Sequence, residues 1–479
     1  MGTSRCMRAA LFTLLLAVPC HVFGQALYIP GGGAAHLSMG GASTATPVDA
    51  IGALYWNPAA IGRLGHSEVA IGGNVLIPRI DLTSTAPSPL GPITGTTRSD
   101  SGVGLASNVG IVYQPEERSL IYGLGMATIA GACVNYPGDV NNPVLSGIGL
   151  LGNVQGPIYS SLTFVQLTPS VAAKLGDNLV VGVGPMIDAA LTSFDPAYFG
   201  SPDDANGDGI GTFPTATHAR PFWGLGFRVG AVYSVSEKLD VGVAYTSQQW
   251  FETWVDHARD ELGQPRTLTL KASLPAIYSA GIGYHASEKL LVNVDLRWFD
   301  YKNTDLFGTS LRDGGLGWKN VFAVATGGRY QMSDRLAVSA GYVYNDNPIE
   351  SVGTLFNVQA PAIVQHTVAF GATMALTDSI SASLGYAYSF RNSISGPVRE
   401  ATGFGVSYAA DAQQVTFTTQ FRFGGCGCRR PCSSCTSCAS CVGDLSNSAS
   451  ASASAPAASE AVAELGRVES PTPQAARFR

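Results

Sequence analysis

The chain has 479 residues, of which 13% are charged and 57 are glycine, and its formal net charge at pH 7 is −6. This mild charge gives no sign of nucleic-acid binding, and a soluble β-sandwich of this size would carry more surface charge. After the N-terminal segment there is no run of about 18 apolar residues, which excludes helical membrane spans.

The first 24 residues have the composition of a secretory signal peptide. Arg5 and Arg8 precede a run of about ten apolar residues, and small residues then lead to Gly24. This apolar run is too short to cross a bilayer as a helix. The sequence therefore predicts export, with residues 1–24 removed by cleavage after Gly24.

Residues 25–64 are apolar and glycine-rich and show no strand alternation. From Val48 they predict one short helix, with Asp49 near its start and Asn57-Pro58 at its end. A lead-in of about forty residues before a barrel has the right size for a plug in the lumen. We therefore expect a hatch over residues 25–64.

Residues 65–423 alternate between apolar and polar side chains in short runs. In the run from Leu290 to Trp298, the apolar side chains share one face, and Asn293, Asp295 and Arg297 share the other. Half-buried soluble sheets alternate too, but the aromatic ends favour a membrane, where such rings sit at the headgroup level. The pattern predicts strands at 66–82, 102–114, 119–134, 158–175, 178–193, 221–235, 238–251, 267–285, 289–301, 318–332, 335–344, 364–376, 379–390 and 413–423.

The connections between these strands alternate between short turns and long loops. The loops are rich in Pro, Gly, Asp and Asn and cover roughly 83–101, 135–157, 194–220, 252–266, 302–317, 345–363 and 391–412. Short periplasmic turns and long external loops are typical of bacterial outer-membrane barrels, which have even strand numbers. The sequence predicts an all-β fold, a 14-stranded antiparallel transmembrane β-barrel with an N-terminal hatch, in the cell outer membrane.

The hatch sequence resembles that of the long-chain fatty acid transporter family of outer-membrane proteins, which includes toluene and xylene uptake proteins. The resemblance rests on a Met-Gly-Gly-Ala stretch, on the segment around Asp49, and on Tyr55 followed by Trp56, Asn57, Pro58 and Ala59. Ala60 stands where the family has Gly. The resemblance implies a monomeric plugged barrel for passive uptake of hydrophobic molecules, such as long-chain fatty acids or aromatic hydrocarbons.

The resemblance also implies a lateral exit beside a third strand that is kinked inwards. Here the third strand carries Gly123, Gly125 and Gly131 as kink candidates, because glycine permits kinks and bulges. The alternative is that these glycines only make room for the hatch. Asp49, Trp56, Asn57, Pro58 and Ala59 are the candidate hatch or gate residues. The substrate-binding residues are not predicted.

Two further segments carry candidate ligands. Asp204, Asn206 and Asp208 resemble the first half of a calcium loop, although Thr215 stands where a closing Glu is expected, and the alternative is a solvated acidic loop. The six cysteines of the segment 424–445 lie within sixteen residues: Cys426, Cys428, Cys432, Cys435, Cys438 and Cys441. Disulfides are the expected state in an exported protein, with zinc or iron–sulfur as the alternative. The Ala/Ser-rich residues 446–479 are predicted to be disordered.

Catalysis finds little support in the sequence, because the histidines are scattered and none lies in a nucleophile motif. We expect no cofactor and no nucleic-acid partner. The expected partners are a hydrophobic small molecule, outer-membrane lipid and the barrel-assembly machinery. The alternative function is a structural or adhesive surface barrel without transport.

Overall fold

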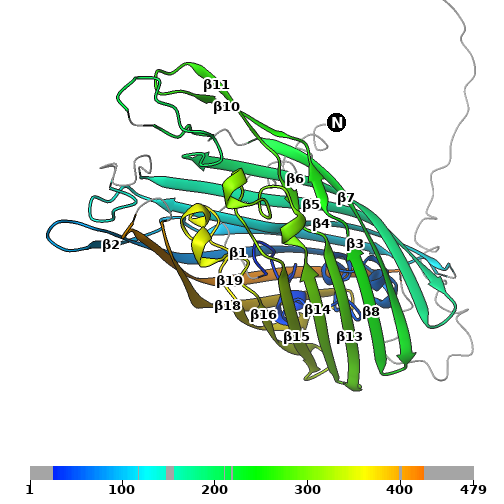
Figure 1. Cartoon of the computed structure of the whole chain (residues 1–479). Helices are drawn as coiled ribbons and strands as arrows, with labels where there is room; N and C mark the ends of the chain where they lie inside the picture. Colours follow the sequence, from blue (N-terminus) through cyan, green and yellow to red (C-terminus); the bar gives the residue numbers. More distant parts are fainter. Residues whose placement is uncertain are drawn as a thin grey trace, which may run out of the picture. The chain divides into compact units, whose positions relative to one another are not determined.

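A computed structural model of the chain describes residues 25–424, apart from residues 117, 147–155, 210, 217–219 and 399–401. The predicted signal peptide and both predicted tail segments lie outside the described residues. The described part is almost entirely β-structure (Figure 1). Its strands are β1 Ser67–Ala86, β2 Ile93–Arg98, β3 Gly104–Tyr113, β4 Leu120–Tyr136, β5 Ile158–Leu175, β6 Leu179–Asp195, β7 Pro221–Ser236, β8 Leu239–Thr246, β9 Gln249–Phe251, β10 Trp254–Arg259, β11 Pro265–Leu270, β12 Ser273–Leu274, β13 Ile277–Ser287, β14 Leu290–Phe299, β15 Val321–Gln331, β16 Leu336–Asn345, β17 His366–Ala375, β18 Ile380–Pro397 and β19 Gly405–Phe423.

The helices of the described part are short. They are α2 Ala34–Ser38, α3 Ala50–Tyr55, η1 Pro58–Arg63, η2 Tyr301–Asn303, η3 Leu311–Asp313, η4 Ser351–Gly353 and η5 Leu355–Asn357. Among the residues described, none of these helices has the length and apolar composition to cross a bilayer.

The main sheet contains seventeen strands and closes on itself, because β19 pairs with β1 from Ser67–Phe423 to Thr85–Gly405. Three of the crossings are each divided into two strands: β2 and β3, β8 and β9, and β12 and β13. The two strands of each pair belong to one crossing, because both pair with the same neighbouring crossing. The described strands therefore make fourteen antiparallel crossings, as the sequence predicts. We call the end of the barrel that carries the short connections the turn end, and the other end the loop end.

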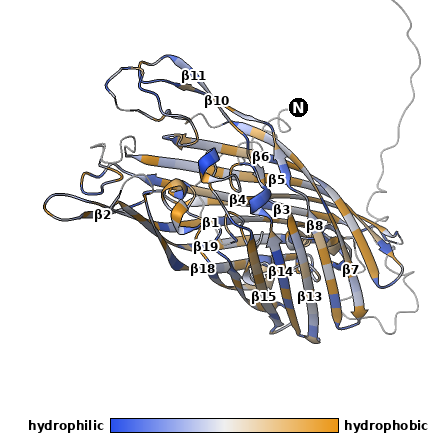
Figure 2. Ribbon diagram, in the orientation of Figure 1, coloured by the Kyte–Doolittle hydropathy of each residue, from blue (hydrophilic) through white to orange (hydrophobic). Residues whose placement is uncertain are grey.

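The outer face of the barrel is apolar. Along crossings such as β14 and β19, exposed apolar residues alternate with buried residues that face the lumen. Figure 2 shows the matching change of hydropathy along the strands. Leu296 is 45% exposed, Leu384 61% and Phe417 56%. Water would make such a continuous apolar surface unstable, whereas lipid tails match it.

Several strands continue beyond the limits that the sequence predicts. β1 extends to Ala86, β18 to Pro397, and β19 begins at Gly405, so little of the predicted loop 391–412 remains. The predicted loop 252–266 holds the start of the β10–β11 hairpin, a separate two-stranded sheet at the loop end (Figure 1). Outside the membrane a strand needs no apolar outer face, so these extensions lack the alternation that reveals the spans.

Candidate functional site

The segment from Gln25 to His66, which we call the hatch, lies inside the barrel and almost all of it is buried. Asp49 begins α3, because its side chain accepts a hydrogen bond from the Gly52 N–H at 2.6 Å. The helix ends at Tyr55. The short apolar elements of the hatch then pack against the lumen face of the strands.

The predicted pair Asn57-Pro58 directly follows the end of α3, whose C-cap is Trp56, and also begins the next element. Asn57 accepts a hydrogen bond from the Ala59 N–H at 3.0 Å and so caps η1, in which Pro58 takes the first position. The Asn57 amide donates to the Thr44 carbonyl at 2.7 Å and to the Ala231 carbonyl on β7 at 3.2 Å. Asn57 therefore ties two parts of the hatch to the wall.

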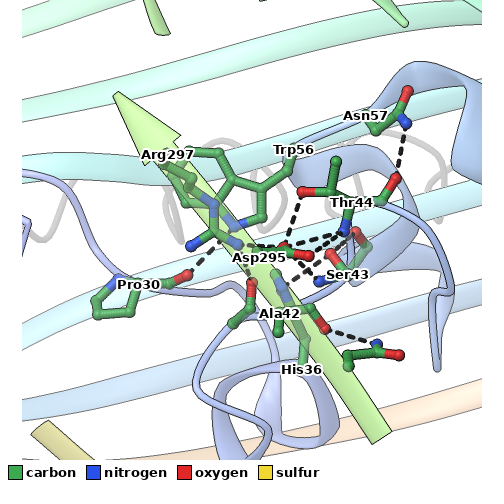
Figure 3. Close-up of polar contacts among 12 residues, drawn as sticks. Pro30, His36, Ala42, Ser43, Thr44, Trp56, Asn57, Asp295 and Arg297 are labelled. Atoms are coloured by element: carbon green, nitrogen blue, oxygen red, sulfur yellow. Dashed lines mark hydrogen bonds and ion pairs between the residues drawn. The ribbon is translucent and has the colours of Figure 1, made fainter. Parts of the chain in front are cut away.

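Asp295 on β14 holds the loop before α3. Its carboxylate accepts hydrogen bonds from the Ser43 N–H at 2.9 Å, the Thr44 N–H at 3.0 Å and the Thr44 hydroxyl at 2.8 Å (Figure 3). Such a buried carboxylate needs donors on every side, because an unpaired charge inside a protein is costly. The hydrogen-bond donors to this carboxylate come both from the hatch and from the barrel wall.

Arg297, two residues along β14, completes this clamp. It donates to the Asp295 carboxylate at 2.6 Å and to the Gly41 carbonyl at 2.5 Å. Its guanidinium carbon lies 4.2 Å from the centre of the Trp56 ring (Figure 3). Both charged side chains are only 1% exposed. We call these contacts the Asp295–Arg297 clamp.

A second group of buried contacts lies at the start of β1. Glu68 accepts a hydrogen bond from the Ala50 N–H at 2.8 Å, and Gln420 donates to Asp49 at 3.4 Å. Burial, together with the neighbouring Glu68 carboxylate, raises the pKa of Asp49 to about 7. Burial likewise lowers the pKa of His36 in the hatch to about 4, so this ring is neutral at pH 7.

Glycines on the wall leave room for the hatch backbone. A Cβ added at Gly182 would lie 2.4 Å from the Ala59 nitrogen, and one at Gly341 would lie 2.2 Å from the Gly40 nitrogen. At Gly123 and Gly125 the added atom would meet the Leu54 side chain, at 2.6 and 3.2 Å. The positions of Gly123 and Gly125 thus agree with the alternative that they make room for the hatch.

β4 leaves the barrel wall at its midpoint. Its pairing with β3 ends at Asn108–Ala127, and its register with β5 shifts between Thr128 and Ala130. From Thr128 to Val134 both faces of β4 are buried, so the alternation between lipid and lumen stops. We call the interruption between β3 and this part of β4 the wall gap.

The start of the hatch covers the free edge of β4. Ile29 donates to the Ile129 carbonyl at 2.8 Å, and Gly131 donates to the Leu27 carbonyl at 3.0 Å. Gly131, the third predicted kink residue, therefore lies just beyond the register shift. A crevice of about 20 Å³ remains between β3, β4, β5, β7 and α3, which is space for about one water molecule.

An aromatic path connects the hatch with the loops. Trp56 contacts Phe299 with ring centres 6.3 Å apart, Phe299 contacts Tyr301 at 6.2 Å, and Tyr301 contacts Phe307 at 6.2 Å. Phe307 lines a pocket of about 90 Å³ between loops at the loop end, whose other walls include Tyr198. We call this chain of four rings the aromatic line.

The sequence identified Trp56 as a hatch residue but missed the partners that surround it. Asp295 and Arg297 stood out only as the polar face of a strand, and Phe299 and Tyr301 only as its end. A charged pair facing the lumen in a chain with few charges is the signal that could have marked the clamp.

The predicted calcium loop is exposed. Asp204 accepts a hydrogen bond from the Gly209 N–H at 3.1 Å, and Asn206 accepts one from the Asp208 N–H at 2.9 Å. Within the described residues, no three Asp, Glu, His or Cys side chains converge as metal ligands. Calcium binding stays a prediction. The six clustered cysteines lie outside the described residues.

Comparisons with known proteins agree with this architecture. The family described as outer membrane protein transport protein (OMPP1/FadL/TodX) matches residues 18–423. Outer membrane protein P1 of Haemophilus influenzae is 26% identical over 185 residues, which are 35% of this chain and 38% of that protein. The match therefore covers well under half of that relative's length.

Solved structures show the same fold. The toluene transporter TodX of P. putida superposes with a TM-score of 0.63 at 14% identity, over 83% of this chain and 100% of that one. A FadL homologue of Pseudomonas aeruginosa gives a TM-score of 0.64 at 16% identity, over 83% and 100%. The closed fourteen-crossing barrel, its apolar outer face and the family match together show that this chain is an outer-membrane protein of the OMPP1/FadL/TodX transport family.

Proposed function

We propose that the protein is a plugged channel for the passive uptake of hydrophobic molecules, such as long-chain fatty acids or aromatic hydrocarbons. The aromatic line is the observation that carries this proposal, because its ring contacts join the loop pocket to Trp56 in the hatch without interruption. Apolar shape is sufficient for binding such molecules. The toluene transporter that shares the fold supports the same class of cargo.

The exit is proposed to be lateral, through the wall gap and into the membrane. Two observations support it: β4 leaves β3 at Asn108–Ala127, and Leu27–Ile29 covers the part of the freed edge from Ile129 to Gly131, before Asp100 bonds the edge at Asn135. The crevice beside it is too small for a hydrocarbon. Passage therefore requires Leu27–Ile29 to detach from β4, so this segment acts as the gate.

A reversible cross-link tests the gate. Tyr28 and Ala130 form an antiparallel bridge, a separation that suits a disulfide. In the variant Tyr28→Cys/Ala130→Cys we expect oxidation to stop toluene uptake into proteoliposomes, and reduction to restore it. Because the oxidised and reduced forms of one variant are compared, any effect of the two substitutions on uptake is the same in both measurements.

The matched control is Val243→Cys/Ala280→Cys, a cross-strand pair of the β8–β13 ladder away from the gap. This cross-link should leave uptake unchanged, as should the reductant added to the unaltered protein. Full uptake by the oxidised Tyr28–Ala130 variant would contradict the lateral gate. A protein that takes up nothing in either state would favour the alternative, a structural surface barrel.

A further inference from the structure

Two buried amides lie on the lumen face near the wall gap. Asn74 on β1 is 2% exposed and Asn108 on β3 is 0% exposed. Neither the oxygen nor the nitrogen of either amide has a hydrogen-bond partner among the described residues. Buried amides are nearly always paired, because an unpaired polar group loses its hydration without compensation. These two side chains therefore offer unused donors and acceptors.

The strand register brings the two amides to one patch. Asn74 lies opposite Ala106, and Asn108 lies opposite Gly72, so the amides are diagonal neighbours on the same face of the β1–β3 ladder. Diagonal neighbours lie within reach of each other's side chains. The residues opposite them on this ladder are Ala and Gly, whose side chains offer no hydrogen-bond partner to either amide.

This patch lies at the inner edge of the proposed exit. Asn108 belongs to the last pair of the β3–β4 ladder, beyond which the wall gap begins. Ile29 packs against Leu76 and Ala106 beside the amides, and its N–H is bonded to Ile129 on β4. The segment that closes the gap therefore also packs beside the two amides. When this segment detaches, the gap opens and the amides lose their cover in the same step.

The cationic side chain that lines the crevice beside the gap, in the described part of the chain, is already fully bonded. Arg228 lines the crevice beside the gap, but its guanidinium donates to the Leu54 and Tyr55 carbonyls, to Gln166 and to Thr246. The guanidinium therefore already bonds the end of α3 and the neighbouring strands. Two amides without a cation suit an uncharged group that both donates and accepts, such as a hydroxyl, better than a carboxylate.

We propose that Asn74 and Asn108 form a hydroxyl-recognition site at the inner edge of the wall gap, which favours uncharged hydroxyl-bearing hydrophobic molecules such as phenols or long-chain alcohols. This inference rests on the proposed function and narrows its substrate class. A site that hydrogen-bonds a hydroxyl rejects the analogue without one, because the amides then stay unpaired as the analogue passes.

Toluene and p-cresol test the site, because they differ by one hydroxyl. In proteoliposomes we expect the unaltered protein to take up p-cresol faster than toluene. The variant Asn74→Leu/Asn108→Leu keeps the side-chain size but removes the amides. It should lower p-cresol uptake about three- to tenfold, the worth of one neutral hydrogen bond, and leave toluene uptake unchanged or faster.

Two controls make the outcome readable. Thr373→Val removes a lumen-facing hydroxyl of β17, away from the gap, and should change neither rate. The double Leu variant should keep its heat-modifiable gel mobility, because it removes unpaired buried polar groups rather than bonded ones. This measurement separates a loss of recognition from a loss of folding.

An equal fall in both rates would overturn the proposal, because the amides would then be structural. No change in either rate would also overturn it, because the amides would then bond water alone. If the unaltered protein passes neither compound, the proposed function itself fails. If it passes both and the variant does not discriminate, only the hydroxyl site fails.

Discussion

Ser43, Thr44 and Arg297 surround the Asp295 carboxylate with hydrogen-bond donors inside the lumen. In Arg297→Met the apolar stem remains, but the carboxylate loses its counter-ion. Removing one partner of a buried ion pair costs about 3–5 kcal/mol. We therefore expect the purified variant to unfold at a clearly lower temperature, measured by the heat-modifiable shift in gel mobility.

Arg98→Met is the matched control for this prediction. Like Arg297, Arg98 forms an ion pair, in this case with Asp81. Its side chain is 66% exposed, and exposed ion pairs contribute little to stability. The control should unfold at the temperature of the unaltered protein. Equal behaviour of the two variants would mean that the Asp295–Arg297 clamp does not hold the hatch.

Asp49 gives the hatch a dependence on pH. Burial, with Glu68 nearby, raises its pKa from 3.8 to about 7, so the folded state holds this proton more tightly than the unfolded state does. The contribution of this proton to the free energy of unfolding is fully present below about pH 4 and is lost as pH rises through 7. His36, whose pKa falls from 6.5 to about 4, acts oppositely and adds stability as pH rises between these values.

The Asp49→Asn variant separates the two groups, because it removes the carboxyl but leaves His36. The stability of the unaltered protein minus that of the variant should fall as pH rises from 4 to 7 and level off above. Thermal unfolding in detergent across this range measures the difference. A difference that does not vary with pH would show that Asp49 does not titrate in the hatch.

The sequence predicted individual hatch residues better than their contacts. Asp49 was expected near a helix start, since a capping side chain acts on residues next to it in the chain. Asn57 was expected at the end of that helix, which stops at Tyr55, but its roles as the cap of η1 and as a partner of Ala231 on β7 were not expected. The Ala231 contact spans 174 residues, and no local pattern encodes where the hatch meets the wall.

At the scale of the elements, the wall glycines position the hatch. A Cβ at Gly242 on β8 would lie 2.3 Å from the Thr44 carbonyl oxygen, whereas one at Gly328 on β15 would meet nothing closer than 3.9 Å. We expect Gly242→Ala to displace the hatch and to let small sugars leak through the barrel. Gly328→Ala should remain sealed, and liposome swelling compares the two. A sealed Gly242→Ala variant would contradict this seating.

The crossings could be predicted because lipid on one side and lumen on the other impose alternation on every span. The extensions of β18 and β19 beyond the spans face no lipid, so the residues around Ser393 read as a loop. The kink in β4 could not be placed from glycines, because the register shift lies at Thr128–Ala130. It depends on Leu27–Ile29, a partner about a hundred residues earlier.

At the scale of the whole molecule, the loop end should face the outside of the cell. Long external loops and short periplasmic turns are the rule for bacterial barrels. An epitope tag near residue 205 or 355 should therefore be reachable on intact cells, and one near residue 237 or 334 should not. Antibody labelling before and after permeabilisation measures this. The reverse labelling pattern would invert the proposed direction of uptake.

The central claim is that the hatch seals the barrel to water-soluble molecules while hydrophobic molecules pass. Fourteen strands enclose a lumen wide enough for water, so an unplugged barrel would admit sugars. The most direct measurement compares, in the same proteoliposomes, the entry of toluene or a long-chain fatty acid with swelling in a small sugar. We predict protein-dependent entry of the hydrophobic molecule without swelling. Rapid swelling, or no entry of either hydrophobic molecule, would contradict the account.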